Sequence, residues 1–284
     1  MSKKIIDVKR LLNIVKDKVR DYTKDNQLKL VIMTDHSDPA SETYLRSKKK
    51  HCEDVNITCE IVDISNMTKE QALAELQSLN MDESVSGIIV QLPCQKDYAD
   101  TLISQIHYAK DVDGLTAFNK YKLANGSPVT EMLLPCTPQG ILWILDSIDF
   151  KYDGAYALVC GRSELVGKPL VQLLNMMNCT ITLANSHTDY SKINNNNYDL
   201  VVSAIGKPNF FNITDQNKDP EVVLIDVGIS RDENGKLCGD INLDKSTYKM
   251  ATKVPGGVGL MTVGSLLYNI TKADRIQKGI KEDI

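Results

Sequence analysis

The sequence predicts an α/β protein of two domains, each with a mostly parallel sheet. In both halves of the chain, short apolar runs alternate with amphipathic stretches of about 10 to 15 residues, which is typical of βαβ units. The length of 284 residues is enough for about two domains. We expect the boundary between Asp113 and Thr137.

The first half opens with an amphipathic helix, because the apolar residues between Leu11 and Val19 are separated by Lys, Arg and Asp. Thr68 and Gln71 form a capping box that begins another helix, which extends through Leu79. Apolar runs bounded by polar residues predict strands at residues 28–33, 57–62 and 86–91, and a further helix covers residues 41–55.

The second half begins with a helix from Thr137, the expected N-cap, with Pro138 in the first helical position. Another helix starts near Lys168, and the last one starts near Thr262. The run Asn194–Asn197 predicts a surface loop. Strands are predicted at residues 155–160, 180–184, 200–204 and 222–226.

Composition excludes several classes of function. The formal net charge of −4 provides no basic surface for nucleic acid. No apolar run reaches the roughly 18 residues that cross a bilayer, so we expect no membrane association. The four scattered histidines form no metal-ligand pattern, and we expect no metal. The seven cysteines contain no C-x-x-C pair, which predicts reduced thiols in a cytoplasmic protein.

A turn between the strand at residues 155–160 and the next helix is a candidate nucleotide site. The segment Gly161-Arg-Ser-Glu-Leu-Val-Gly167 places backbone N–H groups at a helix N-terminus, where a pyrophosphate can bind. It matches neither the P-loop nor the G-x-G-x-x-G motif, because five residues separate the glycines and residue 163 is Ser. A purely structural turn explains the two glycines equally well.

The end of the next strand favours NADP over NAD. Folds that bind NAD usually place an acidic residue there to bind the ribose 2′-hydroxyl, whereas this strand is followed by Asn185-Ser186-His187. Arg162 can instead bind a 2′-phosphate, with a hydrogen bond from Ser186. The alternative is that Arg162 is a surface residue in a salt bridge.

The first half contains a candidate reaction site. Tyr44 and Lys48 are four residues apart on a predicted helix and share a face. Gln91 ends a buried strand, where α/β sheets present ligand-binding side chains. The alternatives are a solvated lysine run and a polar strand terminus. Asp113 precedes a glycine and either binds a ligand or forms part of a turn.

Glycines near the C-terminus complete the set of candidate motifs. Pro255-Gly-Gly-Val-Gly259 either allows close approach of a ligand or forms an interdomain turn. Together, six ordered motifs resemble the bifunctional methylenetetrahydrofolate dehydrogenase/cyclohydrolase family, from about residue 35 to residue 270. These motifs are Tyr44-x-x-x-Lys48, Val90-Gln-Leu-Pro93, Lys110-Asp-Val-Asp-Gly114, Pro135-Cys-Thr-Pro138, Gly161-Arg-Ser163 with Val166-Gly167, and Pro255-Gly-Gly-Val-Gly259-x-Met-Thr262.

The resemblance implies a catalytic domain over residues 1–120, with the C-terminal helix at 262–284 packed on it. It implies a doubly wound, Rossmann-like NADP-binding domain over residues 121–261, with folate in the cleft between the domains. The implied activity is oxidation of methylenetetrahydrofolate with NADP, followed by hydrolysis to 10-formyltetrahydrofolate. A homodimer and a place in one-carbon metabolism and purine biosynthesis are implied as well.

The resemblance also implies a role for each matching residue. Lys48 is the catalytic group for hydrolysis, and Tyr44 and Gln91 shape its protonation and position. Asp113 is expected to hold the pterin ring, and the other expected substrate-binding residues are Tyr44, Pro255, Gly256 and Gly257. The expected cofactor-binding residues are Gly161, Arg162, Ser163, Val166, Gly167, Ser186 and Ile229.

Four positions depart from the usual pattern of the family. His36 replaces a glycine, Gln95 and Leu260 each replace a proline, and Asn185 replaces a common histidine. None of these changes removes a group assigned to catalysis, although Asn185 bears on the preference for NADP. Two other functions stay open: an NAD-linked dehydrogenase without hydrolase activity, and a non-catalytic protein that binds folate or nucleotide.

Overall fold

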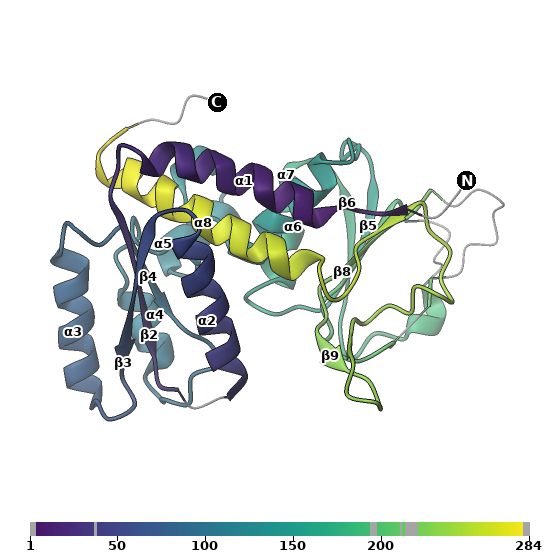
Figure 1. Cartoon of the computed structure of the whole chain (residues 1–284). Coiled ribbons are helices and arrows are strands. Elements are labelled where there is room, and N and C mark those ends of the chain that lie inside the picture. Colours follow the sequence, from purple (N-terminus) through teal and green to yellow (C-terminus); the bar gives the residue numbers. More distant parts are fainter. Residues whose placement is uncertain (1–3, 37–38, 194–197, 211, 214–220, 281–284) are drawn as a thin grey trace. The chain divides into compact units, whose positions relative to one another are not determined.

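The computed structural model describes residues 4–36, 39–193, 198–210, 212–213 and 221–280. The chain divides into two compact units: unit 1 comprises residues 1–12 and 137–262, and unit 2 comprises residues 13–136 and 263–284. The predicted α/β class is confirmed, since each unit contains a parallel sheet and helices (Figure 1). Within the described part of the chain, no helix combines the length and the hydropathy that a bilayer span requires.

The sheet of unit 2 has three parallel strands in the order β3-β2-β4. The central strand β2 (Leu28–Thr34) pairs with β3 (Ile57–Asp63) on one side and with β4 (Gly87–Val90) on the other. Because helices lie on both faces of this sheet, β2 and β4 consist almost entirely of buried residues (Figure 1). The carboxyl ends of β2 and β4 are neighbours, and Gln91 follows β4 at this edge.

Two helices cover one face of this sheet and a third lies on the other. The helices α3 (Lys69–Met81) and α4 (Ala99–Gln105) share a buried apolar core with the strands, and α2 (Pro39–Glu53) lies opposite (Figure 1). The predicted capping box of α3 is confirmed, because Thr68 Oγ1 accepts from the Gln71 N–H and Gln71 Oε1 accepts from the Thr68 N–H.

The division between the two compact units lies at Cys136 and Thr137, whereas the domain ranges that the resemblance implies divide after residue 120. The intervening helices α5 (Ala117–Ala124) and η1 (Val129–Glu131) belong to unit 2. Polar contacts explain this assignment, since Lys272 Nζ on the C-terminal helix donates to the Val129 carbonyl at 2.5 Å. Lys4 and Ile5 belong to unit 1, where they pair with Met250 and Ala251 of its sheet.

The sheet of unit 1 has six parallel strands in the order β1-β11-β8-β7-β5-β6. The strand order reverses at β5, because β6 lies on one side of β5 and β7 on the other. An antiparallel hairpin of β9 (Ser230–Arg231) and β10 (Leu237–Cys238) stands apart from it. The six strands are β1 (Lys4–Ile5), β5 (Tyr156–Cys160), β6 (Thr180–Ala184), β7 (Leu200–Ser203), β8 (Val223–Asp226) and β11 (Met250–Ala251).

Two helix starts differ from the prediction. The helix α6 (Cys136–Asp146) begins two residues before the predicted first position, so Thr137 is inside its first turn and not at the N-cap. The Thr137 hydroxyl lies 3.0 Å from Thr262 Oγ1. The last helix, α8 (Val258–Gln277), begins directly after Gly257 and therefore includes Thr262. The helix therefore starts before the position predicted from the sequence. Gly257 and Gly259 lower the helix propensity of this segment, because glycine is a poor helix former.

The remaining helices either lie near their predicted positions or are single turns. The opening helix α1 (Val8–Thr23) and the helix α7 (Gly167–Met176) lie close to their predicted positions, and η2 (Tyr190–Lys192) is a single 3-10 turn. The predicted loop at Asn194–Asn197 lies outside the described residues.

Candidate active site

The carboxyl edge of the sheet in unit 2 holds a lysine–glutamine pair. Lys48 Nζ on α2 donates to Gln91 Oε1 at 2.9 Å. Gln91 is 5% exposed, its backbone N–H donates to the Met33 carbonyl at 2.8 Å, and its Nε2 donates to the Leu92 carbonyl at 2.5 Å. These bonds fix the amide with its oxygen toward Lys48. The hydrogen bond to Gln91 therefore fixes the position of the Lys48 amine, and the Lys48 side chain is half-buried.

Tyr44 lies one turn before Lys48 on the same continuous helix. Its side chain is 49% exposed, so the phenol can meet a ligand from solvent. Residues four apart lie on one helix face, and the helix therefore presents a phenol and an amine together.

Asp113 lies in a loop that two side chains, Asn269 and Cys136, hold in place. Asn269 Nδ2 on α8 donates to the carbonyls of Val112 and Leu134, at 2.8 Å each. The Cys136 thiol lies 3.3 Å from the Val112 carbonyl and 3.5 Å from Asp113 Oδ1. The carboxylate of Asp113 is only half-buried and stays available to a ligand. Sequence reasoning missed Asn269, which no local pattern marks.

The Cys136 thiol is buried beside Asp113. Burial, and after it the negative charge of Asp113, raise the pKa of this thiol well above its ordinary value, whereas the positive charge of Lys48 lowers it. The thiol is therefore protonated at neutral pH. Hydrogen bonds thus join residues of four predicted motifs in two pairs within unit 2, Lys48 with Gln91 and Asp113 with Cys136.

The nearby acid Asp111 is buried and bonded within its own loop, unlike Asp113. It is 1% exposed and accepts hydrogen bonds from the backbone N–H groups of Leu115 and Thr116 and from Asn119 Nδ2. Burial raises the pKa of Asp111, and these donors oppose that effect. Asp111 thus stabilises the loop, which leaves Asp113 as the acid that can bind a ligand.

Two of the departures from the family pattern lie beside this site. His36 has a φ of +51°, in the left-handed region where glycine is favoured. Gln95, which replaces a proline, donates its backbone N–H to Asp35 Oδ2 at 2.7 Å. A proline has no N–H and cannot form this bond. The loop after β4 is therefore anchored to the end of β2 by a bond that depends on the departure at residue 95.

Replacing Gln95 by proline is expected to lower the free energy of unfolding by about 1.5–3 kcal/mol, because Asp35 loses a charge-assisted hydrogen bond. Gln95→Ala is the matched control, since it keeps the N–H. Urea unfolding of both variants measures the difference. Equal stability of the two would show that the bond to Asp35 contributes nothing.

The turn between β5 and α7 in unit 1 has a tightly packed backbone. Gly161 has a φ of +115°, and a Cβ added to it would lie 2.4 Å from the Ala204 carbonyl oxygen. A Cβ added to Gly167 would lie 1.9 Å from the carbonyl oxygen of Gly161. No side chain fits at either position. The turn brings the N-terminus of α7 to the carboxyl edge of the sheet, which suits a pyrophosphate.

The other predicted cofactor residues surround this turn or lie farther along the same edge. Arg162, Ser163 and Ser186 are exposed, and Ser163 Oγ accepts from the Val166 N–H at 3.2 Å. Ile229, which follows β8, is 47% exposed. The side chain of Asn185 is part of its own turn, because its Oδ1 accepts from the His187 N–H at 3.0 Å.

The glycine motif before α8 also lies in unit 1. Pro255 is exposed, Gly256 has a φ of +94°, and Gly257 is buried. A Cβ added to Gly257 would lie 2.4 Å from the Lys253 carbonyl oxygen, so the chain needs glycine there. Leu260, where the family usually has proline, donates its backbone N–H to the carbonyl of Gly257 at 3.0 Å.

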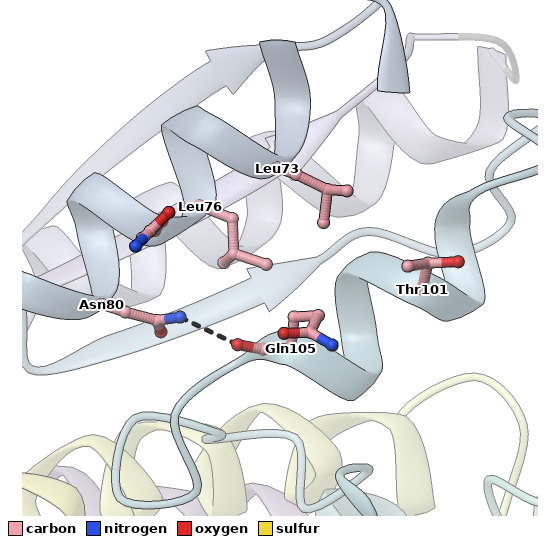
Figure 2. Close-up of a pocket in the computed structure, with 6 residues that line it drawn as sticks. Leu73, Leu76, Asn80, Thr101 and Gln105 are labelled. Atoms are coloured by element: carbon pink, nitrogen blue, oxygen red, sulfur yellow. Dashed lines mark hydrogen bonds between the residues drawn. The ribbon is translucent and has the colours of Figure 1, made fainter. Parts of the chain in front are cut away.

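A pocket elsewhere in unit 2 contains none of the predicted site residues. It has a volume of about 440 Å³ and lies between α3 and α4, where Asn80 Nδ2 donates to the Gln105 carbonyl at 2.8 Å (Figure 2). Its lining is uncharged and consists of Leu73, Leu76, Gln77, Asn80, Thr101 and Gln105. Among the described residues, no group of three or more His, Cys, Asp or Glu side chains is arranged to hold a metal.

Comparison with known families gives two matches along the chain. Residues 6–113 match the catalytic domain of tetrahydrofolate dehydrogenase/cyclohydrolase, and residues 135–278 match its NAD(P)-binding domain. The bifunctional protein FolD of Staphylococcus epidermidis is 36% identical over 289 residues, which covers 99% of each chain. FolD of Staphylococcus saprophyticus is 38% identical and covers 99% of this chain and 100% of its own.

Solved structures agree with these matches. The bifunctional enzyme FolD from Campylobacter jejuni, a methylenetetrahydrofolate dehydrogenase/cyclohydrolase, superposes with a TM-score of 0.87 at 32% identity, covering 97% of this chain and 100% of its own. The Trypanosoma brucei dehydrogenase-cyclohydrolase, complexed with NADP cofactor and inhibitor, gives a TM-score of 0.84 at 26% identity, covering 98% of this chain and 99% of its own.

Proposed function

This chain belongs to the tetrahydrofolate dehydrogenase/cyclohydrolase family, and we propose that it oxidises 5,10-methylenetetrahydrofolate with NADP and hydrolyses the resulting 5,10-methenyltetrahydrofolate to 10-formyltetrahydrofolate. The observation that carries the proposal is the amine of Lys48 held by Gln91. The half-buried carboxylate of Asp113, in a loop held by Asn269 and Cys136, supports it.

The two steps place different demands on the protein. NADP, when bound, supplies the acceptor for the hydride that leaves the one-carbon bridge. Protein groups contribute to this step chiefly by orientation. Hydrolysis in addition requires proton transfers as water adds to the methenyl carbon and the ring opens. Lys48 Nζ is the group we assign to these transfers, and Gln91 Oε1 fixes where the amine stands.

The folate is assigned to Asp113, Tyr44 and the motif Pro255–Gly257. A carboxylate such as Asp113 pairs with the N–H groups of a pterin through two charge-assisted hydrogen bonds. The clamp formed by Asn269 and Cys136 holds the loop that carries this carboxylate.

The residues of unit 1 fit NADP in two respects. The close approach of Gly161 and Gly167 leaves no room for side chains where a pyrophosphate would meet the backbone at the start of α7. Arg162 and Ser186 are exposed and carry the donors that a 2′-phosphate requires. Ser163, Val166 and Ile229 complete the proposed cofactor site.

Arg162→Ala is expected to raise the KM for NADP by about tenfold or more and to leave the KM for NAD nearly unchanged, because only NADP carries the 2′-phosphate. Arg231→Ala serves as the control, since Arg231 is an exposed arginine bonded to the Gly235 carbonyl in the β9–β10 hairpin. Initial-rate kinetics with both cofactors provide the measurement. Equal changes for NADP and NAD would mean that Arg162 does not recognise the phosphate.

One assay tests the proposed function as a whole. Purified protein is mixed with methylenetetrahydrofolate and either NADP or NAD, and reduced cofactor and methenyl absorbance are followed together. We expect NADPH to form without a lasting methenyl signal. Reduction of NAD with lasting methenyl would indicate an NAD-linked dehydrogenase without hydrolase activity, and binding without turnover would indicate a non-catalytic protein.

A homodimer, a cytoplasmic location and a place in purine biosynthesis are further parts of the proposal. The homodimer and the place in purine biosynthesis rest on the family resemblance, and the cytoplasmic location rests on the cysteine pattern. Sedimentation of the purified protein tests the homodimer.

A further inference from the structure

Two buried carboxylates lie at the carboxyl edge of the sheet in unit 1, and the proposed chemistry uses neither. Asp226 ends β8 and is 3% exposed, and Asp240 follows the β9–β10 hairpin and is 0% exposed. Burying a carboxylate is costly unless hydrogen bonds satisfy it. The positions of their partners therefore indicate what these two side chains hold in place.

Asp226 binds the turn that follows its own strand. Its Oδ1 accepts from the backbone N–H groups of Gly228 at 3.1 Å and Asp240 at 3.0 Å, and its Oδ2 accepts from the Ile241 N–H at 2.9 Å. Burial raises the pKa of Asp226 to about 6, and these backbone donors oppose the rise. The residue after Gly228 is Ile229, one of the proposed cofactor residues.

Asp240 binds the segment that follows β7. Its Oδ2 accepts from Ser203 Oγ at 2.8 Å and from the Ile205 N–H at 2.7 Å, and its Oδ1 accepts from the Lys207 N–H at 2.9 Å. One side chain thus fixes the path of residues 203–207.

Each of the two carboxylates packs closely against a glycine in the segment of the other. A Cβ added to Gly228 would lie 2.0 Å from Asp240 Oδ1, and a Cβ added to Gly239 would lie 2.1 Å from Asp226 Oδ2. Each carboxylate therefore packs against a backbone where no side chain can fit. The arrangement couples the turn after β8 to the segment after β7.

Both segments lie where this sheet is expected to receive a dinucleotide. In open α/β sheets, ligands bind beyond the carboxyl ends of the strands where the strand order reverses, and here the order reverses between β5 and β7. The segment held by Asp240 includes Ala204, whose N–H donates to the Cys160 carbonyl at 2.8 Å. The Ala204 carbonyl leaves no room for a Cβ on Gly161, the first residue of the proposed phosphate turn.

We propose that Asp226 and Asp240 are positioning residues for NADP, holding residues 204–207 and 228–229 in the arrangement that receives the cofactor. They act only through these segments. This inference rests on the proposed function, in which dehydrogenation requires NADP and hydrolysis does not. The same protein sample therefore provides a reaction that depends on the pair and one that does not.

The test is Asp240→Asn in the full-length protein. The amide keeps the shape of the carboxylate but turns a donor toward the N–H groups of Ile205 or Lys207. We expect the KM for NADP to rise by about tenfold or more. The kcat at saturating NADP and the rate of methenyltetrahydrofolate hydrolysis should be unchanged. Asp232→Asn is the control, because Asp232 also accepts backbone N–H bonds, from Asn234 and Lys236, but is only half-buried and its bonds are exposed.

An unchanged KM for NADP, or a fall in hydrolysis in proportion to dehydrogenation, would overturn the proposal. If Asp240→Asn does not fold, Ser203→Ala is the second variant, because it removes one donor to Asp240. It should also raise the KM for NADP, by a smaller factor. No rise in this KM would overturn the proposal as well. If the parent catalyses neither reaction, the proposed function fails. Calorimetry of NADP binding to the parent and Asp240→Asn then still tests the pair, because weaker binding supports it and equal binding contradicts it.

Discussion

Replacing Lys48 by methionine is expected to reduce hydrolysis of methenyltetrahydrofolate by at least about 100-fold, because a positioned general acid/base group contributes this much or more. Methionine has a similar length but cannot move a proton. NADP and folate binding should be largely kept, since Gln91 and the Asp113 loop are held mostly by other bonds. Dehydrogenation should therefore persist.

The measurement is the rate at which the purified variant hydrolyses methenyltetrahydrofolate. Lys49→Met is the matched control, because Lys49 is the next residue on α2 and is exposed. The control should hydrolyse at the parental rate. Parental hydrolysis by the Lys48 variant would show that another group transfers the protons.

Asp113→Asn should weaken both reactions, unlike the lysine variant. The carboxylate is assigned to the pterin ring, and both reactions use the same ring. Loss of charge-assisted hydrogen bonds worth about 1.5–3 kcal/mol corresponds to a rise of roughly 10- to 100-fold in the KM for folate. The KM for NADP should stay the same, since the cofactor is assigned to residues of unit 1.

Kinetics with methylenetetrahydrofolate and with methenyltetrahydrofolate test this expectation. Asp97→Asn is the control, because Asp97 is an exposed acid in the same unit. An Asp113→Asn variant whose KM for both folates equals that of the parent would exclude the assigned role. A variant that loses only hydrolysis would instead indicate that Asp113 assists Lys48.

Much of the fold is predictable because it depends on local patterns. The buried strands β2 and β5 and the edge strand β6 are apolar or β-branched runs with polar boundaries, and Thr68 with Gln71 marks the start of α3. The two-residue strands β1 and β11 give no such signal. They exist because Lys4 pairs with Met250, far away in the sequence, and only the tertiary fold brings them together.

In the candidate site, too, some residues can be predicted from local patterns and others depend on contacts between distant parts of the chain. Tyr44 and Lys48 share a face through helical spacing, and Gln91 is found because it ends a buried strand. The clamp on Asp113 depends on Asn269, more than 100 residues away, and on a cysteine inside the motif Pro135-Cys-Thr-Pro138. Asp226 and Asp240 were missed for the same reason, since their partners lie on other strands and loops.

The central claim is that the amine of Lys48, held by Gln91, carries out hydrolysis but is not needed for hydride removal. The most direct measurement is the ratio of methenyltetrahydrofolate to NADPH that Lys48→Met forms from methylenetetrahydrofolate, corrected for spontaneous hydrolysis. We expect the two products to accumulate in equal amounts. NADPH formed without methenyltetrahydrofolate, as in the parent, would contradict the claim.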